Sequence, residues 1–149
     1  MKITMKQSFD CQEPEIKIIY SQMDVELERL VEQLNLFSSS FMIEYEGITK
    51  KVPLADIYYF DTADNKTFLY MAEQVYPCSR KLYELEATLG GTPFVRISKS
   101  CILNTNHVVS VRAGFSGRLE ARLRNGEKIV ISKHYLRSFR EKIEQEAAE

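Results

Sequence analysis

The chain of 149 residues lacks any run of about 18 apolar residues, so no segment is predicted to span a membrane. Its N-terminus, MKITMKQSFD, has no continuous apolar core, which argues against a signal peptide. These two absences predict a cytoplasmic protein. Hydrophobic residues make up 44% of the chain, as in an ordinary globular protein. The length fits one domain, or one domain with a small appendage.

Residue patterns that enzymes use are also missing. The sequence contains no G-x-S-x-G, no phosphate-binding glycine loop and no H-x-x-E-H or C-x-x-C ligand set. The cysteines Cys11, Cys78 and Cys101 are odd in number and widely spaced, so we expect free thiols, with any redox role left open. We expect neither an enzyme nor a cofactor, although any fold could assemble paired carboxylates in space.

The charge is divided along the chain. Residues 94–143 hold eleven Lys and Arg against three Glu, a balance of +8, while the whole chain carries −1 and the remaining residues therefore carry −9. Such a division is typical of a protein with a polyanionic partner, DNA or RNA first. The alternative is a solvated basic face on an ordinary domain.

Residues 1–40 differ from the rest. MKITMKQ and EIKIIY predict a strand, a turn and a strand, and SQMDVELERLVEQLNLF predicts a helix. Its apolar stripe consists of Met23, Leu27, Leu30, Val31 and Leu34, which must be buried on its own strands or on a partner. The serines at 38–40 are the predicted boundary between this strand-strand-helix arm, 1–40, and a second domain, 41–149.

From residue 41 onward, two-residue alternation predicts a mainly β domain. Hairpins are expected at Glu46-Gly47, Asp64-Asn65 and Asn125-Gly126, the last with a type I′ turn. Further strands are expected at 94–97, 101–104 and 107–112. A helix is predicted to begin at the N-cap Ser79 and to end at Gly90-Gly91. The C-terminal residues predict a second helix whose inner face comprises Tyr135, Leu136, Phe139 and Ile143.

Three short polar segments interrupt these strands, at residues 64–67, 96–100 and 132–134. Lys, Arg, Ser and Thr side chains and turn N–H groups bind phosphate oxygens, and Arg, Lys, His and Asn also contact base edges. Each segment alone could be a solvated turn. Three of them, two within the basic region, favour nucleic-acid binding.

The order of segments resembles the LytTR (LytR/AlgR-type) DNA-binding domain of bacterial transcription regulators. The matching segments are LADIYYFDTADNKTFLYM, KLYELEATL, FVRISKSCILNTNHVVSV and NGEKIVISKHYL, and the resemblance covers about 41–143. It implies an α+β fold that is mainly β, with stacked small sheets, one packed helix and a C-terminal helix. It also implies sequence-specific binding of double-stranded DNA by loops in successive major grooves.

The resemblance assigns roles to individual residues. Base-contact candidates are Lys66 or Thr67, then Lys99, then Lys133 with His134, whereas Arg96, Ser100 and Ser132 would contact phosphates or organise their loops. The motif residue Asn104 would fix its own loop, and His107 is expected to have no role. His134 stands where Arg is frequent, which leaves the sequence preference open. Because an imidazole loses its positive charge near pH 6.5, the contact of His134 is expected to weaken above about that pH. The alternative is an exposed neutral imidazole.

Many family members carry a receiver domain, which residues 1–40 are too short to hold, so we expect a regulator without one. The arm would then form a homodimer on promoter direct repeats or dock a regulatory partner, such as a membrane-protein antagonist. We expect no small-molecule substrate. The alternative function is a regulator that sequesters another transcription factor or a membrane partner without binding DNA.

Overall fold

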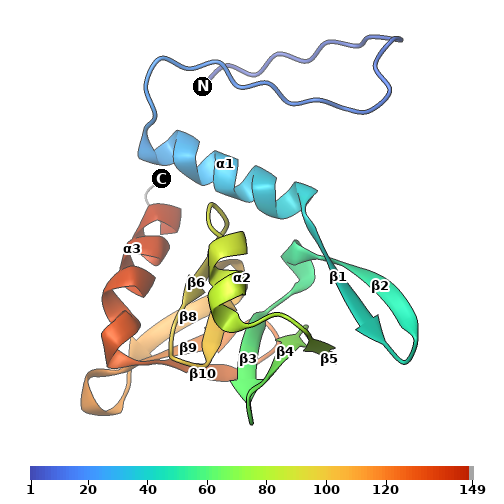
Figure 1. The fold of residues 1–149 in the computed structure, drawn as a ribbon. Coiled ribbons are helices and arrows are strands. Elements are labelled where there is room, and N and C mark those ends of the chain that lie inside the picture. Colours follow the sequence, from blue (N-terminus) through green and yellow to red (C-terminus); the bar gives the residue numbers. More distant parts are fainter. Residues whose placement is uncertain (148–149) are drawn as a thin grey trace.

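The structure is a computed structural model that describes residues 1–147, with side chains described through residue 144. Within this range the chain forms three α-helices and ten strands (Figure 1). The helices are α1 (Val25–Ser38), α2 (Leu82–Thr88) and α3 (Leu136–Ala147). The predicted α+β fold, mainly β with a packed helix and a C-terminal helix, is confirmed. None of the described helices is long and apolar enough to cross a membrane.

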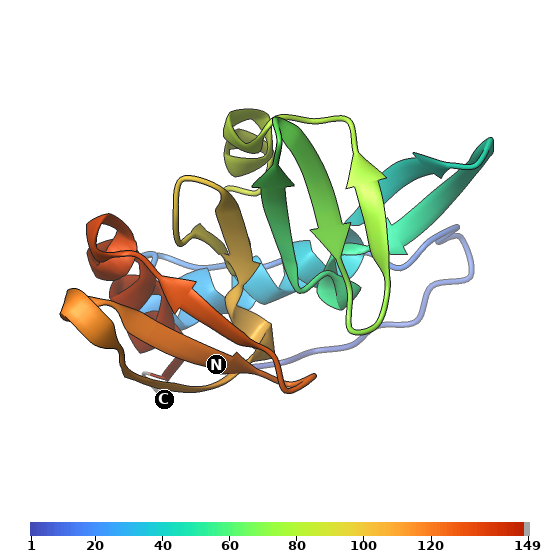
Figure 2. The same cartoon turned by 90° about the horizontal axis from the view of Figure 1, so that it is seen from below.

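The strands form three antiparallel sheets that follow one another across the molecule (Figure 2). The first pairs β1 (Ser40–Tyr45) with β2 (Ile48–Pro53). The central sheet has the order β5-β4-β3-β7-β6, formed by Val75–Cys78, Lys66–Tyr70, Tyr59–Ala63, Cys101–Asn104 and Phe94–Arg96. The third has the order β10-β9-β8, formed by Lys128–Ile131, Leu119–Leu123 and Val108–Ala113. Short 3-10 turns lie at Leu54–Asp56, Thr105–His107, Phe115–Gly117 and Lys133–Tyr135.

Two predicted hairpin turns are confirmed and the third differs. Asp64 and Asn65 have φ of 53° and 62°, the left-handed values that a tight hairpin turn needs. In the β9–β10 hairpin, Gly126 donates its N–H to the Leu123 carbonyl at 3.0 Å and only Gly126, at φ 90°, is left-handed. The type I′ prediction is therefore wrong, because a three-residue loop with a glycine bulge replaces the two-residue turn.

Two hydrophobic clusters form the core. In the first, Leu82, Leu85 and Leu89 on the α2 side pack with Phe60 of the central sheet. In the second cluster, the predicted inner face of α3 packs with residues of the third sheet, and Phe139 is 1% exposed. The N-cap of α2 is Lys81, whose N–H donates to the Glu84 carboxylate at 3.2 Å, so the prediction of Ser79 is wrong. The Glu84 carboxylate in the first turn thus accepts the N–H of the N-cap residue, which is the bond that the glutamate of a capping box makes.

The two predicted N-terminal strands are absent. Residues 1–24 form an extended segment without helix or strand, drawn in dark blue in Figure 1. Its alternating apolar residues, such as Ile3, Met5, Ile16 and Ile19, are exposed. Two short strands that pack against nothing gain too little from burial to stay paired, which explains why the predicted strands do not form.

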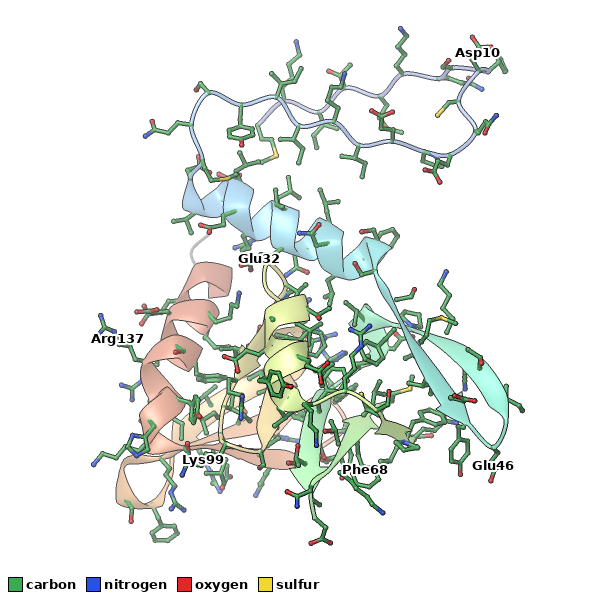
Figure 3. The ribbon with its side chains drawn as sticks, in the orientation of Figure 1. Asp10, Glu32, Glu46, Phe68, Lys99 and Arg137 are labelled. Atoms are coloured by element: carbon green, nitrogen blue, oxygen red, sulfur yellow. The ribbon has the colours of Figure 1, made fainter. Side chains whose placement is uncertain are left out.

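Helix α1 is present as predicted, and Asp24 caps it by accepting the Leu27 N–H at 2.8 Å. It lies across the domain at the end opposite Lys99 (Figure 3). Leu36 joins the cluster that contains Phe41, whereas no other residue of α1 belongs to either cluster. The boundary at residue 40 stays a prediction, since a cut there would remove a core residue from the domain.

Candidate nucleic-acid interface

The three polar loops lie at one edge of the molecule, where backbone hydrogen bonds join the middle loop to the third loop and to the strand before the first loop. Thr62, near the end of β3 and before the first loop, donates its N–H to the Ser100 carbonyl at 2.9 Å. Ser132 in the third loop donates its N–H to the Ile97 carbonyl, also at 2.9 Å. The loop at 96–100 therefore sits between the loops at 64–67 and 132–134. We call these three loops the loop edge; Lys99 marks it in Figure 3.

Arg96 organises the middle loop from inside. Its Nε donates to the Ser98 carbonyl at 2.7 Å, and its Nη2 donates to the Lys99 carbonyl. Its Nη1 forms an ion pair with Glu86 at 2.7 Å, and the Arg96 side chain is 19% exposed. With its donors directed at these partners, Arg96 fixes the loop backbone and leaves the exposed Lys99 at its tip.

Serine hydroxyls complete that loop. Ser98 Oγ accepts the Ser100 N–H at 3.2 Å and lies 3.3 Å from Ser100 Oγ. Asn104, which is fully buried and ends β7, donates from Nδ2 to the Ile57 carbonyl at 3.0 Å and accepts the Asn106 N–H at 3.1 Å. Asn104 thus has the geometry of a residue that fixes the backbone around its own turn.

The other candidate residues divide by exposure. Lys66, Lys133 and His134 are exposed, whereas Ser100 and Ser132 are half-buried. Thr67 is only 5% exposed and pairs with Cys78 of the neighbouring strand. Of the two alternatives in the first loop, the structure therefore favours Lys66.

Two cations near the first loop were missed by the sequence analysis. Arg80 and Lys81, at the start of α2, line a surface pocket together with Lys66 and Thr67. Their position directly before a predicted helix could have pointed to them, since a helix N-terminus often lies near a bound anion. Helix α2 is short, however, so this position alone is weak evidence. They extend the positive charge of the loop edge toward the central sheet.

A contact between the central and third sheets lies at the start of β3, at the other end of this strand from the first loop. The Tyr59 hydroxyl of β3 donates to Glu127 Oε2 at 2.8 Å, and its ring stacks on Tyr70 with centroids 4.4 Å apart. Burial, and then the neighbouring Glu127 carboxylate, raise the pKa of Tyr59, so it remains a neutral donor. Burial also raises the pKa of the Cys101 thiol. Among the described residues, no group of three or more His, Cys, Asp or Glu could hold a metal ion.

Exposed cations on loops joined at one edge of a β-rich domain are the features of a loop-based nucleic-acid-binding domain. Residues 48–144 match the family model of the LytTr DNA-binding domain. The chain belongs to this LytTR family. The match includes all three loops and the cations beside them.

The relatives that the chain matches are named as signalling or transcriptional regulatory proteins. The chain is 28% identical over 106 residues to the sensory transduction protein LytT of Enterococcus faecalis, covering 71% of the chain and 44% of that protein. It is 25% identical over 107 residues to the transcriptional regulatory protein LytR of Staphylococcus aureus, covering 72% and 44%. The chain thus spans less than half the length of these relatives.

A solved structure shares the fold. It is the LytTr DNA-binding domain of a protein from Bacillus cereus described as a methyl-accepting/DNA response regulator. The TM-score is 0.66 at 24% sequence identity, and the match covers 71% of this chain and 97% of that domain. The comparison therefore shows that the sheets and helices of this chain adopt the LytTR arrangement.

Proposed function

We propose that the protein is a bacterial, cytoplasmic transcriptional regulator that binds specific double-stranded DNA sequences without enzymatic activity. The loops of the loop edge enter successive major grooves. The observation that carries this proposal is the middle loop, which is joined by backbone hydrogen bonds to the third loop and to strand β3 next to the first loop, with an exposed lysine on each of the three loops inside the LytTR family match.

Each loop has its own role in this proposal. Lys99 and His134 contact base edges, with Lys133 beside the second of them, and Lys66 makes the contact of the first loop. Ser100 and Ser132 donate their hydroxyls to phosphate oxygens. Arg96 acts through the middle loop as a positioning residue. Thr67, which is buried, makes no contact with DNA.

The central experiment compares Lys99→Ala with Arg122→Ala. Both side chains are exposed cations, but Arg122 lies on the outer face of β9, away from the three loops. On a duplex selected from a random library, Lys99→Ala should cost about 1–3 kcal/mol and relax sequence preference. Arg122→Ala should weaken all sequences alike or have no effect. Equal losses on selected and random DNA for Lys99→Ala would show that Lys99 touches phosphate only.

Salt dependence tests DNA binding as such. A protein that contacts about six phosphates loses about 10³-fold in affinity between about 50 and 200 mM salt. We expect a fall of this size for the full chain on the selected duplex. A folded protein that binds no duplex at any salt concentration contradicts the proposed function.

We also propose that the chain forms a homodimer on promoter direct repeats through its first 40 residues. The α1 stripe residues Leu30, Val31 and Leu34 are half-buried and outside both core clusters. The segment before them exposes further apolar side chains. Dimerisation would bury this surface and would raise the effective concentration of the second DNA-binding domain.

Sedimentation of wild type and Leu30→Asp tests the dimer. The aspartate places a charge in the stripe and should split the dimer, while Glu26→Gln, an exposed change on the same helix, should not. Wild type that stays monomeric at concentrations on the order of 10 µM, with and without DNA, contradicts the dimer.

The second candidate is a regulator that sequesters another transcription factor or docks a membrane-protein antagonist through the same arm. The exposed apolar residues of the N-terminal segment favour it, because contiguous exposed apolar surface marks interaction sites. Duplex binding at low salt separates the two candidates, since only the first requires it.

A further inference from the structure

The tip of the β8–β9 connection presents an aromatic side chain to solvent. Phe115 is 92% exposed, between Gly114 and Gly117. Two hydrogen bonds fix the tip: the Gly114 N–H to the Arg118 carbonyl at 2.9 Å and the Arg118 N–H to the Phe115 carbonyl at 3.1 Å. Ser116 has φ 57°, a left-handed conformation that is uncommon outside glycine. The backbone thus holds an apolar ring outward although burial would be favourable.

This tip adjoins the loop edge. A Cβ built on Gly117 would lie 3.8 Å from Lys133 Cε, so the Lys133 side chain runs along the tip. The connection, drawn in orange in Figure 1, projects on the side of the molecule where Figure 3 shows Lys99. Arg118 directly follows Gly117, and Arg118 and Lys133 are both exposed, so two cationic side chains lie at or beside the tip.

This juxtaposition matches the chemistry of one ligand class. A phenyl ring has no hydrogen-bond donor or acceptor and so cannot read the donor and acceptor pattern of the major groove. An apolar side chain contacts DNA either at a thymine methyl group in the major groove or as a wedge that inserts between base steps from the minor groove, where it unstacks the bases and bends the duplex. The adjacent third loop enters a major groove in the proposed function, and the next groove along a duplex is minor.

We propose that Phe115 is a minor-groove wedge that inserts between base pairs next to the contact of the loop at 132–134, while Arg118 binds a flanking phosphate. This inference rests on the proposed function and extends it to a fourth DNA contact. The wedge makes the target preference depend on a deformable base step that no hydrogen bond reads. A pyrimidine–purine step, which unstacks most easily, fits that position.

The test uses the full chain and the selected duplex, with 2-aminopurine replacing single adenines along and beside the site. Wild type should raise the fluorescence of the probe at one step, because unstacking relieves its quenching. Phe115→Ala should abolish that rise and lower affinity about tenfold, with an unchanged salt slope. Phe115→Leu, which keeps an apolar wedge, should retain most of the rise. Arg118→Ala should reduce the salt slope by about 0.9 and leave the fluorescence rise in place.

The outcomes separate this inference from the proposed function. If wild type binds the duplex and Phe115→Ala binds equally well with the same fluorescence, the wedge is wrong and the proposed function stands. If wild type binds no duplex, the proposed function fails first. If Phe115→Ala loses binding to vesicles of anionic phospholipid but not to DNA, the tip is a membrane contact and the wedge is overturned. Because Phe115 is exposed, circular dichroism should show the same fold for all variants.

Discussion

The loop edge and the α1 end of the molecule are held in different ways. At the loop edge, backbone hydrogen bonds join the loops to one another and to the central sheet. At the opposite end, α1 is attached mainly by side-chain pairs: Glu32 with Lys142 at 3.0 Å, and Gln33 with Asn106 at 3.1 and 2.9 Å. Backbone bonds persist through most substitutions, whereas each side-chain pair depends on two residue identities.

The two ends should therefore differ in how freely their residues can be exchanged without a change in backbone structure. Exposed residues of the loop edge can be exchanged while the loops stay in place, which suits a surface that sets DNA preference. At the α1 end, substitution of either residue in the Glu32–Lys142 or Gln33–Asn106 pair removes the interaction. Helix α3 reaches both ends, since it starts after the loop at 132–134 and carries Lys142 toward α1. The predictions below test whether the two ends are independent.

The largest effect is expected for Arg96→Ala. Arg96 is the residue of the loop edge for which the comparison above does not hold, because its side chain, and not the backbone, fixes the middle loop. The substitution removes charge-assisted bonds to the Ser98 and Lys99 carbonyls, each worth about 1.5–3 kcal/mol. We expect affinity for the selected duplex to fall about 100-fold, measured by fluorescence anisotropy, because Lys99 loses its fixed position.

Glu86→Ala is the matched control, because it removes only the outer ion pair of Arg96. Glu86 is 54% exposed, so affinity should change by about twofold at most. An Arg96→Ala protein that keeps sequence-specific binding would show that the serine and backbone bonds alone hold the loop.

A smaller effect, on stability rather than on DNA binding, is expected for Lys142→Met. It leaves the Glu32 carboxylate, 11% exposed, without its cationic partner. The free energy of unfolding should fall by about 1–3 kcal/mol in urea titrations, and Glu32→Gln in the same chain should recover part of the loss.

DNA affinity of the folded Lys142→Met protein should match wild type, because the pair lies at the end opposite the loop edge. A clear loss of affinity under conditions where the variant is fully folded would mean that α3 couples the two ends.

The same contrast explains what the sequence could predict. Hairpin turns and the α3 face depend on neighbouring residues, so alternation and helical spacing were sufficient to locate them. The burial of Thr67 could also have been predicted, because in β4 it shares a face with the fully buried Leu69. The pairing of Gln33 with Asn106, 73 residues apart, and the inward role of Arg96 depend on the folded arrangement, which no local pattern encodes.

The smallest effect concerns His107, which lies in the 3-10 turn beside Asn106 and so near the α1 end. Its ring stacks on Tyr58 with centroids 3.9 Å apart, and its Nε2 donates to the Ala55 carbonyl at 2.7 Å. Nδ1 has no hydrogen-bond partner among the described residues. Burial lowers the pKa of His107, against the opposing effect of the Ala55 hydrogen bond, and Arg124 adds to the lowering while Asp56 opposes it.

The folded state therefore favours neutral His107, whereas in the unfolded chain it takes up a proton near pH 6.5. Its contribution to stability is present above that pH and is lost as the pH falls below it. Urea unfolding at pH 7.5 and 5.5 should show a larger loss of stability for wild type than for His107→Gln, which can keep the donor but cannot titrate. DNA affinity of His107→Gln should follow that of wild type at each pH, because His107 lies outside the loop edge. Equal pH dependence of stability in the two proteins would show that the ring protonates in the folded state as easily as in the unfolded chain, and that the α1 end carries no pH sensitivity of its own.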